Sequence, residues 1–158
     1  GGQATYEGEP ASELEAAAWH ALDNEIAHFP DDNAGYFASG PSWLDGPYVL
    51  DQKALFEALL GGIEAGAPAD RLALDFHVAV ARSSARIASD ICAHEGIGTV
   101  ALSGGVYMNR LLLQLLTREL KSAGLAILVP HTVPVNDGCI AYGQAAVASA
   151  RLAQIASQ

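Results

Sequence analysis

The second half of the chain has a regular pattern of apolar and polar positions. Short, fully apolar runs at 99–102 and 125–129 are typical of buried strands. Between them, apolar residues at helical spacing predict an amphipathic helix that is closed by Gly124. A small-residue helix is predicted from Asn136-Asp137 to about Gln154. We therefore expect the order strand, helix, strand, helix, with parallel strands covered on both faces. The helical pattern consists of Met108, Leu111, Leu112, Leu115, Leu116 and Leu120.

Two further helices are predicted ahead of the first strand. Asp51 can cap the first, which ends at the breaker residues 66–68. Asp70 begins the second and longer helix, and Gly96 and Gly98 bracket its end. Its expected apolar face consists of Phe76, Val80, Ile87 and Ile91.

The first 50 residues are less regular. Ala11–His28 predicts a helix with Ser12 as a candidate N-cap. A stretch rich in glycine and proline follows, in which we expect short strands or ordered loops. Its aromatic residues are Tyr36, Phe37, Trp43 and Tyr48. We therefore divide the chain into 1–50 and 51–158, two parts of one structural unit.

Composition limits the possible functions. The chain has 158 residues, 51% of them apolar and 16% charged, which suits a folded core and excludes disorder. The net charge of -10 argues against binding a nucleic-acid backbone or an anionic membrane surface. No apolar run reaches the roughly 20 residues of a membrane span, and no signal peptide is recognisable. Two cysteines make no disulfide framework, so we expect the reducing cytoplasm.

The strongest chemical signal is the turn that follows the first predicted strand. Ser103-Gly104-Gly105 leads from the strand end into a helix, where backbone N–H groups can approach phosphate oxygens. Asn109 can offer its amide to a sugar or base. An ordinary strand-to-helix turn remains the alternative. The segment is neither GxGxxG nor GxxxxGK[ST], which excludes Rossmann and P-loop nucleotide sites.

A second polar turn follows the second predicted strand. Because the strands are parallel, Asn136-Asp137 should lie at the same sheet edge as residues 103–105. Asp137 can cap the final helix or bind a divalent metal that bridges to phosphate. The histidines form no HExxH motif, and His77 is interpreted as a packed core residue. Cys139 is interpreted as a small packed residue rather than a reactive thiol.

Four segments resemble the HypF family, the carbamoyltransferases of NiFe-hydrogenase maturation. The family has LSGGVFQNRLLL where this chain has LSGGVYMNRLLL at 102–113, and VPPNDGGIALGQAA where this chain has VPVNDGCIAYGQAA at 133–146. Residues 5–11 with Leu14-Glu15 resemble SYEGQAAxxLE, and residues 75–77 resemble RFH. The matches follow in order and span nearly the whole chain.

The resemblance implies an α/β fold, the second lobe of an actin-like ATPase (ASKHA), with a mixed sheet, a C-terminal βαβα unit and helices on both faces. It implies a fragment of a longer multidomain chain that uses ATP and makes carbamoyladenylate. The lobe would pass the carbamoyl group to the C-terminal cysteine of HypE, where it becomes the cyanide ligand of the hydrogenase iron. The isolated fragment is expected to be inactive.

Site residues carried over from the family are nucleotide-binding or metal-binding; no catalytic residue is identified. Asp137 is the expected metal ligand, with the other ligands in a histidine segment of the missing first lobe. Tyr107, Met108, Val135 and Cys139 depart from the family pattern. The expected nucleotide-binding residues are Ser103, Gly104, Gly105, Asn109, Asn136, Tyr6, Glu7 and Gly8.

Other functions remain open at this point. The same fold serves related O-carbamoyltransferases and the transferase that makes threonylcarbamoyladenosine in tRNA. A non-catalytic docking module is a third possibility, with Tyr36, Phe37 and Trp43 as anchors. An apolar face left open by the missing lobe could also drive homodimerisation.

Overall fold

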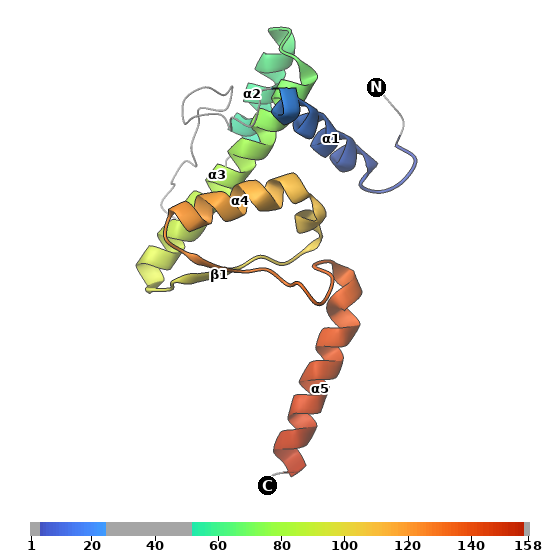
Figure 1. The fold of residues 1–158 in the computed structure, drawn as a ribbon, viewed down its shortest axis with the longest axis vertical. Coiled ribbons are helices and arrows are strands. Elements are labelled where there is room, and N and C mark those ends of the chain that lie inside the picture. The colour runs from blue at the N-terminus through green and yellow to red at the C-terminus, as the bar shows by residue number, and fades with distance from the viewer. Residues whose placement is uncertain (1–3, 25–51, 157–158) are drawn as a thin grey trace.

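The computed structural model describes residues 4–24 and 52–156 (Figure 1). The glycine- and proline-rich stretch with its aromatic residues, the end of the first predicted helix and the Asp51 cap lie outside the described residues. The elements in order are α1 (Glu9–Asn24), α2 (Gln52–Glu64), α3 (Ala69–Glu95), β1 (Thr99–Ala101), η1 (Gly105–Met108), α4 (Arg110–Ser122), β2 (Ala126–Leu128), η2 (Asp137–Cys139) and α5 (Ile140–Ala156), where η marks a 3₁₀-helix.

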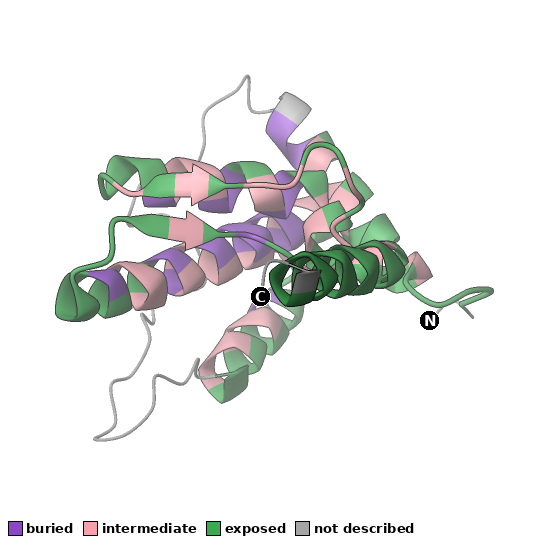
Figure 2. Cartoon of the chain, turned by 90° about the horizontal axis from the view of Figure 1, so that it is seen from below, coloured by how far each residue is buried: buried purple, intermediate pink, exposed green. Residues whose placement is uncertain are grey.

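Helices α1, α3 and α4 enclose the core of the described chain (Figure 2). The leucines predicted on α4 are all buried, which confirms the amphipathic pattern of that helix. Met108 is an exception, because it falls in η1, before α4 begins, and is 63% exposed. The largest fully buried side chains are Leu74, Leu111, Leu115 and Leu120.

The buried side of α3 differs from the predicted one. Phe76, Val80 and Ile87 are only half-buried, and Ile91 is exposed. The core contact is made instead by a neighbouring stripe that contains small residues, which allow the backbones of packed helices to approach closely. That stripe consists of Leu74, Val78, Ala81 and Ala85. Gly96 ends α3 as predicted, in the left-handed conformation at φ 67°.

The start of α1 also differs from the prediction. The helix begins at Glu9. The Glu9 carboxylate accepts hydrogen bonds from the backbone N–H and the hydroxyl of Thr5. These bonds, the backbone one above all, lower the pKa of Glu9. Ser12 is therefore not the N-cap: its hydroxyl lies inside the helix and donates to the Gly8 carbonyl at 3.2 Å.

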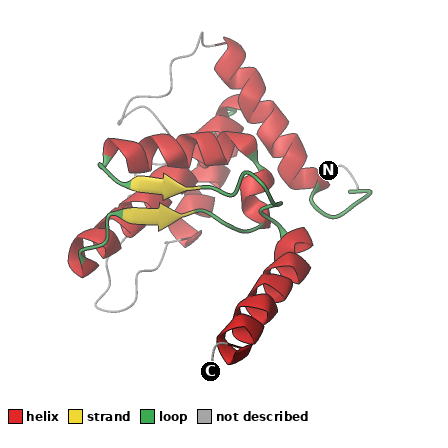
Figure 3. Cartoon of the chain, turned by 60° about the horizontal axis from the view of Figure 1, so that its bottom comes forward, coloured by secondary structure: helices red, strands yellow, loops and turns green. Residues whose placement is uncertain are grey.

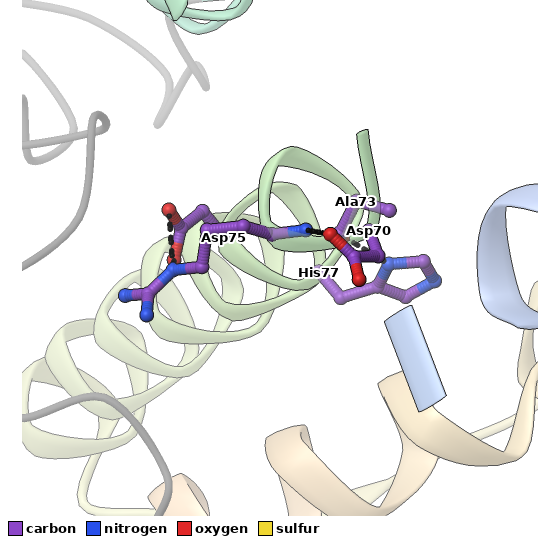
Figure 4. Close-up of polar contacts among 5 residues, drawn as sticks. Asp70, Ala73, Asp75 and His77 are labelled. Carbon is purple, nitrogen blue, oxygen red and sulfur yellow. Dashed lines mark hydrogen bonds and ion pairs between the residues drawn. The ribbon is translucent and has the colours of Figure 1, made fainter. Parts of the chain in front are cut away.

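Polar side chains pair with one another at the start of α3 (Figure 4), and one of them also contacts α1. His20 of α1 contacts the Asp70 carboxylate at 3.1 Å, and this bond lowers the pKa of Asp70. Arg71 Nε donates to both carboxylate oxygens of the buried Asp75 at 3.0 Å. Figure 4 shows Asp75 and His77 leaving α3 on different sides. The carboxylate of Asp75 is thus paired within α3, whereas the ring of His77 also reaches beyond this helix.

The two strands form a parallel βαβ unit with α4 as the crossover. The register pairs Thr99 with Ala126, Val100 with Ile127 and Ala101 with Leu128. In the described residues this sheet is purely parallel rather than mixed. Its helices α3 and α4 cover one face only (Figure 3), and the outer residues of both strands are exposed. The predicted cover on both faces is thus absent from the described part.

Helix α5 extends away from the rest of the described chain (Figure 1). Every residue of α5 whose burial is described is exposed, including Leu152 at 67% and Ile155 at 69%. Small residues such as those of α5 allow close packing, but the described residues place no partner against this helix. None of the helices described combines the length and the apolar character needed to cross a bilayer.

Candidate functional site

The two polar turns meet at the carboxyl ends of the strands. The Gly104 N–H donates to the Val135 carbonyl at 2.8 Å, which joins the turn after β1 to the segment before η2. Asn136 Nδ2 donates to Met108 Sδ at 3.2 Å, a second link between them. The predicted juxtaposition at one sheet edge is confirmed, because neighbouring parallel strands end on the same side.

The glycine turn has a backbone that only glycine adopts easily. Gly104 has φ 119° and ψ 157°, a region where a Cβ atom is strained. The chain then enters η1 rather than α4. Among the described residues, the first N–H groups of η1, on Gly105 and Val106, have no acceptor, which leaves them available to a ligand. Burial raises the pKa of Tyr107, so its phenol is neutral at physiological pH.

Asn109 is held at both ends of its amide. Its Oδ1 accepts from the Leu112 N–H at 2.8 Å, which caps α4, and its Nδ2 contacts His77 Nε2 at 2.8 Å. Asn109 was predicted to offer its amide to a sugar or base. With one Nδ2 hydrogen directed at His77, only the second Nδ2 hydrogen of this amide is left for such a contact. His77 is 3% exposed, which confirms the interpretation of it as a core histidine.

Glu15 of α1 occupies the N-terminus of α4. Its Oε1 accepts from the Arg110 N–H at 2.8 Å and the Leu111 N–H at 3.2 Å, and Trp19 Nε1 donates to the same oxygen. With Leu112 bonded to Asn109, the first N–H groups of α4 are satisfied. A carboxylate also already complements the positive end of the helix dipole. The expected phosphate site at this helix N-terminus is therefore filled by protein.

Replacing Glu15 with alanine should lower the free energy of unfolding by about 1–2 kcal/mol, the usual loss when a helix cap is removed. The matched control is Glu13→Ala, because Glu13 is an exposed residue of the same helix. Urea titration of both variants measures the difference. Equal stability of the two variants would contradict the cap.

Asn136, not Asp137, caps the helical segment that leads into α5. Its Oδ1 accepts from the Gly138 N–H at 3.1 Å. Asp137 is exposed, and its carboxylate has no hydrogen bond or ion pair with any residue in the described ranges. Of the two interpretations that the sequence left open for Asp137, capping is thus wrong. Its charge remains available at the meeting point of the two turns.

A divalent metal could find only part of its ligands here. The described residues contain no group of three histidine, cysteine, aspartate or glutamate side chains that could hold an ion. Asp137 can supply one hard oxygen ligand, which suits a divalent cation but does not hold one alone. Cys139 is half-buried and Cys92 is buried, both as thiols.

The predicted segment Tyr6-Glu7-Gly8 is exposed and precedes α1. No hydrogen bond among the described residues joins it to either turn. Its connection to the site is indirect and runs along α1 to Glu15. Sequence reasoning missed the role of Glu15, although the residue belongs to the first segment that carries the family resemblance.

A parallel βαβ unit with two polar turns at one sheet edge defines an α/β subdomain, and in such folds ligands bind at the carboxyl ends of the strands. A family model described as "Carbamoyltransferase, Kae1-like Domain, second subdomain" matches residues 2–144. The chain belongs to the HypF carbamoyltransferase family and contains this second subdomain.

Curated relatives and solved structures agree with this family. A carbamoyltransferase HypF homolog of Cupriavidus necator is 35% identical over 139 residues, which are 87% of this chain and 35% of the relative. The carbamoyltransferase HypF of Rhizobium leguminosarum is 35% identical over 145 residues, 90% of this chain and 17% of the relative. The chain thus spans about a third or less of these relatives.

Two crystal structures of HypF proteins share the fold. HypF from T. kodakarensis matches with a TM-score of 0.72 and 29% identity over 98% of this chain and 18% of that one. A full-length HypF in a phosphate- and nucleotide-bound form matches with a TM-score of 0.76 and 28% identity over 95% of this chain and 18% of that one.

Proposed function

We propose that this chain is the carbamoyl-transfer lobe of a HypF carbamoyltransferase, which passes a carbamoyl group from carbamoyladenylate to the C-terminal cysteine of HypE. The single observation that carries the proposal is the meeting of the two turns, where the Gly104 N–H donates to Val135, two residues before the exposed Asp137. Backbone N–H groups without an acceptor can bind phosphate oxygens, and a carboxylate without a partner can hold a divalent metal that bridges to phosphate. One solved relative is a nucleotide-bound HypF.

The proposed reaction is nucleophilic transfer. The cysteine thiolate of HypE attacks the carbamoyl carbon and a C–S bond forms. The C–O bond to the adenylate phosphate then breaks, and AMP leaves with the electron pair. We place the reaction in the cytoplasm, where the acceptor cysteine stays reduced.

The glycine turn would bind the nucleotide. The N–H groups of Gly105 and Val106 are the donors that the described fold leaves available, because Glu15 and Asn109 occupy those of α4. Ser103 is exposed at the same turn and can add its hydroxyl. Asn136 would contribute by holding the second turn against the first rather than through a ligand contact of its own amide.

The remaining predicted groups would act from the edge of this site. Asp137 would provide one oxygen ligand to a divalent metal, whose chemistry is to neutralise phosphate charge; the other ligands lie beyond the described residues. Tyr6, Glu7 and Gly8 would approach the nucleotide only when the cleft is complete.

The open surfaces suit a subdomain that packs against the rest of its own chain. The outer sheet face and α5 expose large apolar residues, among them Leu128, Val147 and Leu152. We assign this surface to the other half of an ASKHA-type domain, which would cover the sheet on its second face. A homodimer through α5 is the alternative, and the solution mass of the complete natural chain distinguishes the two.

The nucleotide site is tested by titrating ATP and AMP into the complete natural chain, with and without Mg²⁺. We expect saturable binding that strengthens with the metal. Gly104→Ala should weaken it, whereas Gly124→Ala is a matched control because both glycines have positive φ and Gly124 lies at the far end of α4. Both changes strain the backbone by about 1–3 kcal/mol. A folded chain that binds neither nucleotide would refute the proposal.

A further inference from the structure

His77 of α3 is a buried polar residue whose ring makes two short hydrogen bonds. Nδ1 lies 2.7 Å from the Ala73 carbonyl oxygen, and Nε2 lies 2.8 Å from Asn109 Nδ2 (the first bond is drawn in Figure 4). A carbonyl only accepts, so Nδ1 carries the proton. An amide nitrogen only donates, so Nε2 accepts. The ring is therefore held as the neutral Nδ1–H tautomer.

The orientation of the Asn109 amide is fixed independently. Its Oδ1 accepts from the Leu112 N–H at 2.8 Å, so the nitrogen end must face His77. Asn109 also closes the turn, since its backbone N–H donates to the Val106 carbonyl at 3.1 Å. A bond from α3 thus ends on the residue that joins the glycine turn to α4.

The two bonds of His77 have different reach. The bond to Ala73 stays within one turn of α3 and satisfies a buried ring nitrogen, as a structural histidine requires. The bond to Asn109 crosses 32 residues and ends at the proposed nucleotide site. If it is lost, the half-buried Asn109 amide loses its partner on α3 at the start of α4.

We propose that His77 is a positioning residue for the nucleotide turn, acting through Asn109. The role rests on the proposed function, because it concerns the same site. His77 itself lies in α3 behind Asn109 and reaches the ligand only through it. The acceptor at Nε2 fixes the orientation of the Asn109 amide, and the amide in turn fixes the position of the end of the 103–109 turn.

Two substitutions of His77 each remove one of its two hydrogen bonds and allow the other to be replaced. In His77→Gln the amide oxygen can reach the Nε2 position and accept from Asn109, while the Nδ1 donor is lost. In His77→Asn the amide can replace the Nδ1 donor, while the acceptor toward Asn109 is lost. Both variants lose one hydrogen bond of the buried His77 ring, so their thermal stabilities should fall by similar amounts.

The readout is the affinity of the complete natural chain for ATP. We expect His77→Asn to bind about tenfold more weakly than the wild type, and His77→Gln to recover most of that loss. In an Asn109→Ser background, which keeps a capping oxygen but no amide donor, the two changes should no longer differ. Melting temperatures of all variants identify any that fail to fold.

The outcomes separate the two proposals. Equal ATP affinity of His77→Asn and His77→Gln, with wild-type binding intact, overturns the positioning role and leaves the nucleotide site standing. A difference between them that persists in the Asn109→Ser background overturns the route through Asn109. If His77→Asn does not fold, the ATP affinity of Asn109→Ser is compared with that of the double variant Asn109→Ser/His77→Gln. Because the proposal couples His77 to the site only through Asn109, it predicts that the double variant loses no further ATP affinity. A wild-type chain that binds no ATP overturns the proposed function itself.

Discussion

Asp137→Asn should reduce carbamoyl transfer by the complete natural chain by about a hundredfold or more, because even residues behind a metal ligand change activity roughly ten- to hundredfold. The substitution keeps the shape of the side chain and removes its charge. The carboxylate has no hydrogen bond or ion pair within the described ranges, and Asn136 provides the local cap. Stability should therefore stay within about 0.5 kcal/mol of the wild type.

The measurement is formation of the carbamoylated cysteine on a HypE acceptor, followed together with AMP release. Asp90→Asn is the matched control, because Asp90 is an exposed carboxylate on α3, away from both turns. Mg²⁺ dependence of ATP binding should be weakened in the Asp137 variant and retained in the control. Wild-type transfer by Asp137→Asn would remove Asp137 from the site.

The elements next to the site could be predicted from local sequence. Two short apolar runs, each preceded by a glycine, predicted strands whose ends lie within one residue of those of β1 and β2. Leucines at helical spacing gave the buried face of α4, which Gly124 follows at φ 79°. The meeting of the two turns followed from parallel pairing, since a parallel crossover brings both strand ends to one edge.

The contacts that organise the site could not be predicted, because they join residues distant in sequence. Glu15 reaches α4 across 95 residues, and His77 reaches Asn109 across 32. Nothing in their neighbours indicates a partner. Ser12 was a credible cap on local grounds, but the Thr5–Glu9 bonds start α1 three residues earlier. The choice between Asn136 and Asp137 as a cap depends on backbone geometry that composition does not specify.

The exposure of α5 could not be predicted from the sequence for a different reason. Its small and apolar residues predict a helix that packs closely against a partner, but they do not indicate where that partner lies. The described residues place no partner there. The sequence thus predicted the character of this surface and not its occupant, and the same holds for the open face of the sheet.

The stability of the core formed by α1, α3 and α4, which supports the site, should depend strongly on the leucines of α4. Leu115 is 1% exposed and packs in the core formed by α1, α3 and α4. Leu115→Ala should lower the free energy of unfolding by about 3 kcal/mol, since the removed methyl groups leave a cavity that rigid helices close only in part. Leu60→Ala is the control, because Leu60 on α2 is 57% exposed.

Urea denaturation of both variants measures this difference, and the dependence of stability on urea should be unchanged in each. The expected order places Leu60→Ala within about 0.5 kcal/mol of the wild type. Because Leu115 lies on the helix whose first turn Glu15 and Asn109 cap, loosening it should also weaken ATP binding, whereas the Leu60 change should not. A Leu115 variant as stable as the Leu60 variant would mean that α4 does not pack against α1 and α3, and the positioning of the glycine turn by those helices would fail with it.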